Sequence, residues 1–177
     1  MKNNAQKTSL AAIIAALYCV LSLVVPYLSF GTVQFRFSEI LTILPIFTPV
    51  AIPGLAVGCF ITNLVGYAIS INPAGFWDII IGSLTTLVAA VLTYYLKDIK
   101  IKGLPVLATL PPVILNAAII GLELSIVFMN ELTLPVYWAQ FVSVALGQIA
   151  MCTVGGLVFY KVASKTKLVD LLSKYTN

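Results

Sequence analysis

Long apolar stretches fill almost the whole of this 177-residue chain, and charged residues are confined to short segments between and beyond them. Hydrophobic residues make up 60% of the sequence and charged residues only 9%, against about 25% charged residues in a typical soluble domain. A chain with so few charges cannot cover a water-facing surface. The composition therefore predicts an integral membrane protein, embedded in the lipid bilayer as a single domain over residues 1–177.

The residue types present exclude several kinds of chemistry. The sequence contains no His, so Ser-His, Cys-His and His-metal sites are absent. Cys19, Cys59 and Cys152 stand alone in apolar runs, where we interpret them as small buried hydrophobic residues. No Gly-rich phosphate loop followed by Lys and Ser/Thr occurs, and the lysines sit at the chain ends and in one loop rather than in a nucleic-acid-binding patch. We expect no metal, no cofactor, no nucleic-acid partner and no ATP hydrolysis by this chain.

Lysine positions decide how the apolar segments cross the membrane. Lysines precede the first segment, fill the loop after the fourth and follow the last. Because positive residues stay cytoplasmic, both termini lie inside and the number of spans is even. The short segment 37–48 must then cross, although 12 helical residues cover only about 18 Å of a core of roughly 30 Å. The sequence predicts an all-α bundle of six transmembrane helices, N-in and C-in, over about 8–28, 37–50, 53–70, 76–96, 104–128 and 134–161, with a cytoplasmic tail at 162–177.

Polar side chains collect in the outer half of this predicted bundle. A charge inside the bilayer costs about 2.5–3.5 kcal/mol on insertion scales, so such residues mark functional positions. The direction of each helix places Glu39 and Glu123 toward the exterior, and the cytoplasmic halves hold almost no polar residues. Asn116 and Glu123, seven positions apart, share a helix face. We predict a pocket open to the exterior, with candidate binding residues Arg36, Glu39, Asn63, Tyr67, Trp77, Asp78, Asn116, Glu123, Trp138, Gln140 and Gln148.

Each of these residues also has a purely structural interpretation. Trp77 and Trp138 occur where interfacial aromatic belts lie, Asp78 is placed to cap a helix, and the amides can join helices. As a binding site, carboxylates with amides and aromatic rings suit a planar, nitrogen-rich heterocycle. A carboxylate accepts two parallel N–H bonds from a guanine-like edge, and an aromatic ring stacks on its face. An anionic substrate would call for several basic residues, and only Arg36 is available.

Small residues on the first predicted helix indicate close helix packing. Ala11 and Ala15, and Ala12 and Ala16, form two small-xxx-small pairs in its cytoplasmic half, and 54–58 holds a glycine pair of the same spacing. These residues either pack within the bundle or form an interface with a partner protein. A small binding bundle without an ATP site needs an energy source, and a partner docked near the cytoplasmic side would supply it.

One run of residues is similar to a known family. The run Gln34-Phe-Arg-Phe-Ser-Glu39, followed by 49–59 and by Asn63-Leu64, resembles the QueT family, within the substrate-binding S components of energy-coupling factor (ECF) transporters. The resemblance implies a multi-pass protein of a bacterial-type plasma membrane that takes up a queuosine precursor, a 7-deazaguanine such as preQ1 or queuine. It implies partners too: a transmembrane coupling protein, docked on the alanine pairs, and two cytoplasmic ATPases. Of the candidate residues, Arg36, Glu39 and Asn63 match motif positions.

Other functions remain open on the sequence. An S component for another vitamin or nucleobase-like heterocycle has the same architecture. A proton-coupled secondary transporter also uses intramembrane acids, although 177 residues without a detectable repeat is small for alternating access. An intramembrane enzyme lacks His and a paired Asp motif, and a structural membrane subunit leaves Glu39 and Glu123 without a purpose.

Overall fold

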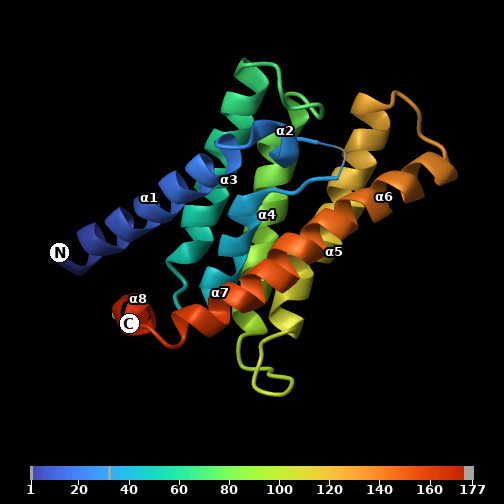
Figure 1. The fold of residues 1–177 in the computed structure, drawn as a ribbon. Coiled ribbons are helices and arrows are strands. Elements are labelled where there is room, and N and C mark those ends of the chain that lie inside the picture. The colour runs from blue at the N-terminus through green and yellow to red at the C-terminus, as the bar shows by residue number, and fades with distance from the viewer. Residues whose placement is uncertain (1, 32, 174–177) are drawn as a thin grey trace.

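The structure, a computed structural model, describes residues 2–31 and 33–173 and consists of packed helices (Figure 1). Within these ranges the extended pairing is limited to an isolated bridge between Ile101 and Leu104 in the loop after α4. Segments labelled η have 3₁₀ or π geometry. The elements are α1 (Lys2–Leu23), α2 (Pro26–Ser29), η1 (Phe37–Ile46), α3 (Ala51–Ala68), α4 (Trp77–Tyr95), η2 (Leu107–Thr109), α5 (Leu110–Glu123), η3 (Leu124–Phe128), α6 (Leu134–Gln148), η4 (Ile149–Gly155), α7 (Gly156–Ala163) and α8 (Leu168–Ser173).

The predicted all-helical membrane fold is confirmed, but the count of six full-length spans is not exact. Among the described residues, 5 helices are long and apolar enough to cross a membrane: Asn4–Leu23, Ala51–Ala68, Trp77–Tyr95, Leu107–Val127 and Leu134–Ala163. The remaining segment, η1, is a 3₁₀ helix of 10 residues. At about 2.0 Å per residue it covers roughly 20 Å, less than the hydrocarbon core. The buried, non-helical backbone of Gln34 and Arg36 precedes it. Such backbone is tolerated at membrane depth only because protein surrounds it.

Most helix boundaries lie near the predicted ones, but α1 begins at Lys2 rather than near residue 8, and other differences lie near prolines. Helices α3 and α4 begin and end within two residues of the predicted 53–70 and 76–96. The first helix, however, ends at Leu23 rather than near residue 28, and Pro26 starts the short helix α2. Proline has no N–H to continue the helical ladder and pushes the preceding residue out of the helical region, and Val25 indeed has φ −129° and ψ 70°.

Glycines bring α1 and α3 into close contact. A Cβ at Gly54 would lie 2.8 Å from the carbonyl oxygen of Ala11, and one at Gly58 would lie 3.0 Å from that of Ala15. No side chain larger than hydrogen therefore fits at either glycine without moving α1. The alanine pair Ala11/Ala15 thus packs inside the bundle, against the glycine pair of α3.

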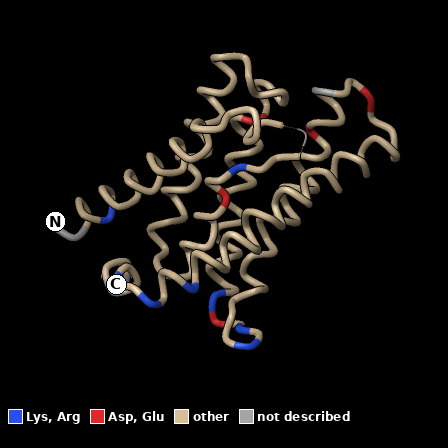
Figure 2. The backbone as a smooth tube through the Cα atoms, in the orientation of Figure 1, with Lys and Arg blue, Asp and Glu red and all other residues tan. Residues whose placement is uncertain are grey.

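Basic residues gather at one end of the bundle (Figure 2). The loop between α4 and η2 carries Lys97, Lys100 and Lys102, and further lysines follow near the end of α7. This is the one-sided distribution that the positive-inside rule requires. The predicted tail 162–177 begins within α7 and includes α8, whose Leu172 is buried against the apolar core that α1 helps to form. Its last residues, 174–177, lie outside the described part of the chain.

Candidate functional site

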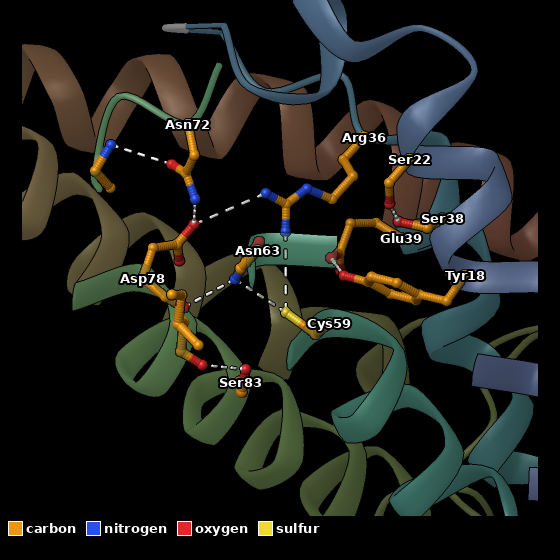
Figure 3. Close-up of polar contacts among 12 residues, drawn as sticks. Tyr18, Ser22, Arg36, Ser38, Glu39, Cys59, Asn63, Asn72, Asp78 and Ser83 are labelled. Atoms are coloured by element: carbon orange, nitrogen blue, oxygen red, sulfur yellow. Dashed lines mark hydrogen bonds and ion pairs between the residues drawn. The ribbon is translucent and has the colours of Figure 1, made fainter. Parts of the chain in front are cut away.

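Arg36 lies at the centre of a buried polar cluster (Figure 3). It immediately precedes η1, so the extended backbone carries its side chain into the bundle. The guanidinium Nη2 is 4.0 Å from Asp78 Oδ2, Nη1 is 4.0 Å from the sulfur of Cys59, and the group lies 4.9 Å from the centre of the Phe30 ring. These distances are long for hydrogen bonds, which have donor–acceptor separations of about 2.7–3.2 Å. Arg36 is therefore surrounded by partners but held loosely.

Asp78 is fixed by two asparagines. Asn72 Nδ2 donates to Asp78 Oδ2 at 2.8 Å, and Asn63 Nδ2 donates to the backbone carbonyl of Asp78 at the same distance. Gly82, one turn further along α4, leaves the space that the carboxylate occupies, because a Cβ there would overlap Asp78 Oδ1. Asp78 makes no side-chain bond that caps α4. Its side chain points into the protein, where its charge faces Arg36.

Glu39 accepts a hydrogen bond from α1 and lies near the π-helical segment η4. Tyr18 OH donates to Glu39 Oε1, and the Cys152 sulfur lies 3.8 Å from Oε2. Both Tyr18 and Glu39 are almost completely buried. Beside them, Ser22 Oγ lies 2.7 Å from Ser38 Oγ. Glu39 therefore belongs to a network that joins α1, η1 and η4 in the middle of the bundle.

A pair of amides completes the cluster from α5 and α6. Asn116 Nδ2 donates to Gln148 Oε1 at 3.1 Å, and the thiol of Cys152 donates to the same oxygen at 3.0 Å. A cavity of about 10 Å³, room for about one water molecule, lies among these groups. Its lining residues are Gln34, Arg36, Glu39, Cys59, Asp78, Gly82, Thr86, Asn116, Ile120 and Gln148, and we call it the central cavity.

A second hollow lies on the other side of the contact between α4 and α5. Its volume is about 260 Å³, and we call it the α4–α5 groove. Glu123 contributes the carboxylate of this otherwise apolar groove. The remaining lining residues are Trp77, Ile81, Ile119, Leu122, Ile126 and Val127.

The structure brings most of the candidate residues together, but not the aromatic ones. Five of them, namely Arg36, Glu39, Asp78, Asn116 and Gln148, line the central cavity, and Asn63 donates to Asp78. Glu123 and Gln140 are buried outside that cavity. Tyr67, Trp77 and Trp138 are 48%, 59% and 55% exposed on the surface of the bundle, which is the position of an interfacial belt.

Some residues of the cluster were not predicted. Tyr18 follows Ala11 by seven positions and Ile14 by four, so helical periodicity places it on the packed face of α1. That periodicity was the available signal for Tyr18. Asn72 lies in the turn before α4, where an Asn is ordinary turn chemistry, and no sequence signal separates it from other turn residues.

Comparison with known proteins identifies the family. The sequence model of the QueT transporter family matches residues 8–165. The chain belongs to the QueT transporter family. Over 90 residues it is 36% identical to the queuosine precursor transporter QueT of Lactococcus lactis subsp. cremoris (strain MG1363), an alignment that covers 49% of this chain and 48% of that protein. The chain thus spans about half the length of the curated relative it matches. No solved structure matches it.

Family membership confirms several expectations from the sequence. The resemblance to QueT proteins is correct, and the family consists of transporters rather than enzymes. Together with the 5 long apolar helices among the described residues, it makes the chain a multi-pass membrane protein.

Proposed function

We propose that this chain is the substrate-binding S subunit of an ATP-driven ECF-type uptake transporter and captures a queuosine precursor, a 7-deazaguanine such as preQ1 or queuine. The observation that carries the proposal is the buried cluster of Arg36, Asp78, Glu39, Asn116 and Gln148 around one cavity in the family's membrane bundle. The name of the Lactococcus relative supports the substrate class.

The chemistry of the cluster suits the edge of a deazaguanine. This edge presents neighbouring N–H donors, which a carboxylate accepts in parallel, and a carbonyl acceptor, which an amide N–H or a guanidinium satisfies. Asp78 and Arg36 supply the carboxylate and the guanidinium, and they already face each other. Because protein rather than water surrounds them, a hydrogen bond that the substrate makes there is electrostatically stronger than the same bond in water.

Substrate entry requires that the cluster open. The central cavity holds about 10 Å³, far less than a bicyclic heterocycle needs. We place the opening at Arg36, since its contacts to Asp78 and Cys59 are both 4.0 Å long and its Nε has no partner among the described residues. In this mechanism the N–H groups of the substrate take over Asp78 as the guanidinium swings away.

Coupling to ATP hydrolysis would use the outer face of α1. Ala11 and Ala15 pack against α3, whereas Ala12 and Ala16 are exposed. An exposed stripe of small residues allows another helix to approach closely in a membrane. We assign Ala12 and Ala16 to the contact with the transmembrane coupling protein, which with two cytoplasmic ATPases would tilt the subunit so that its pocket faces inward.

Calorimetric titration of the detergent-purified subunit tests the proposed function. We expect tight binding of a 7-deazaguanine, weaker binding of guanine and none of riboflavin. Tight riboflavin binding without deazaguanine binding would assign the subunit to another vitamin. Uptake by cells that lack the coupling protein and ATPases would replace the ECF mechanism by secondary transport.

A further inference from the structure

Glu123 differs from the other buried carboxylates in having no hydrogen-bond partner among the described residues. Glu39 accepts from Tyr18, and Asp78 accepts from Asn72 and faces Arg36. Glu123 is only 5% exposed, yet neither of its carboxylate oxygens is bonded to any described residue. A buried carboxylate without a partner loses its hydration and gains nothing in return. Such a group in a native membrane protein is expected to meet a cation during function.

The α4–α5 groove determines what kind of cation reaches Glu123. Apart from this carboxylate the walls of the groove are apolar, and Trp77 lies at its edge. The volume of about 260 Å³ exceeds that of the central cavity many times over. An apolar hollow that holds one carboxylate and is lined by Trp77 suits an organic ammonium group better than a hydrated metal ion.

The groove and the central cavity lie on opposite sides of the contact between α4 and α5, which we call the seam. Trp77 and Ile81 line the groove, while Asp78 and Gly82, their immediate neighbours in α4, line the cavity. In α5, Ile119 lines the groove and its neighbour Ile120 lines the cavity. Asp78 and Glu123 therefore lie on opposite sides of one helix contact.

We propose that Glu123 and the α4–α5 groove form a subsite for a protonated amine carried on an arm of the substrate, while the edge of the base binds the Asp78 side of the seam. This inference rests on the proposed function and assigns a separate role to each of the three buried carboxylates. Asp78 faces the donors of the ring, Glu39 stays within its network with Tyr18, and Glu123 selects substrates whose substituent is cationic. The subunit would therefore discriminate between precursors by the charge of the arm rather than by the ring.

A pair of ligands that differ in the arm tests the subsite. The probes are 7-deazaguanine carrying an aminomethyl group, which is a cation near neutral pH, and 7-deazaguanine carrying a nitrile, which is neutral. Calorimetry on the wild-type subunit should show tighter binding of the amine. Glu123→Gln should weaken amine binding at least tenfold, or about 1.4 kcal/mol, and change nitrile binding less than threefold. Glu131→Gln, in an exposed loop, is the matched control and should change neither.

The outcomes separate the subsite from the proposed function. If wild-type protein binds both ligands and Glu123→Gln weakens both equally or neither, the amine subsite is overturned and the proposed function stands. If wild-type protein binds neither ligand, the proposed function fails and the assignment of an amine substrate to Glu123 fails with it. Retained nitrile binding also shows that the Gln variant is folded.

Tryptophan emission provides a readout that leaves Glu123 intact. The chain has two tryptophans, so Trp138→Phe leaves Trp77, at the groove, as the sole indole. Saturation with the aminomethyl ligand should shift or quench this emission. Trp77→Phe, which leaves only the surface indole of Trp138 outside the groove lining, should show no change. Unaltered Trp77 emission at a saturating amine concentration would place the ligand elsewhere and overturn the subsite, even if the Gln variant fails to fold.

Discussion

Replacing Gly82 by Ala tests whether the position of Asp78 depends on one missing methyl group. A Cβ at position 82 would overlap Asp78 Oδ1 and lie 2.8 Å from Asn63 Nδ2. The carboxylate must then rotate away, which breaks its bond from Asn72 and its pairing with Arg36. A hydrogen bond to a charged group contributes about 1.5–3 kcal/mol, whereas Ala gains about 1 kcal/mol over Gly in a helix.

Gly156→Ala is the matched control for this substitution. It lies in α7, and a Cβ there would meet Ile43 Cδ1 at 3.6 Å, an ordinary van der Waals contact. Both variants gain the same helix propensity, so the free energies of unfolding of the two should differ by about 1.5–3 kcal/mol, with Gly82→Ala the less stable. Unfolding in detergent, followed by heat or denaturant, measures this difference.

The two variants should differ in ligand affinity in the same direction as in stability. Because Asp78 lines the central cavity, Gly82→Ala should weaken deazaguanine binding at least tenfold by calorimetry, and Gly156→Ala should leave it unchanged. Equal stability of the two variants together with unchanged binding would refute the reasoning, since it would mean that the Asp78 carboxylate does not need the space beside Gly82.

Two further substitutions examine the network and the partner surface. Tyr18→Phe leaves Glu39 Oε1 buried without its donor and should lower the free energy of unfolding by about 1–3 kcal/mol. Tyr67→Phe, at an exposed site, should change it little. Equal unfolding midpoints of the two variants would contradict this role of Tyr18. Ala12→Leu should leave ligand binding intact and weaken copurification with the coupling protein, and Ala139→Leu, an exposed alanine on α6, should not. Unimpaired copurification would remove α1 from the interface.

Helix positions were predictable because the bilayer imposes a simple rule on long apolar segments. The spans α3, α4 and α6 to α7 have the predicted lengths, since about 20 apolar residues cannot be placed in another way. The geometry of η1 was not predictable. Its run Phe37–Ile46 is apolar enough for any buried helix, and the 3₁₀ winding depends on surrounding helices that the local sequence does not contain.

Candidate binding residues were predicted best where a charged side chain lies deep in a membrane-spanning segment. Arg36, Glu39 and Asp78 are costly in a bilayer, so their presence alone indicated a shared polar site, and the structure places them together. The positions of the tryptophan rings could not be predicted in this way. Trp77 and Trp138 are large amphipathic side chains near the ends of helices, and composition does not tell a ring that faces a ligand from one that faces the membrane interface.

Unsatisfied polar atoms carry the remaining information about the site. Native structures leave few buried polar groups without partners, and each exception needs a reason. Among the described side chains, the exceptions are Arg36 Nε, Asn63 Oδ1, both oxygens of Glu123, Gln140 Oε1 and the hydroxyls of Ser29, Thr48 and Thr62. The first four residues were candidates from the sequence, and the three hydroxyl residues were not. Lipid cannot satisfy a buried polar atom. Glu39 has its donor in Tyr18, whereas Arg36 Nε and the oxygens of Glu123 have no partner among the described residues. Under the proposed function the substrate supplies these partners, while Glu39 and Tyr18 hold the framework.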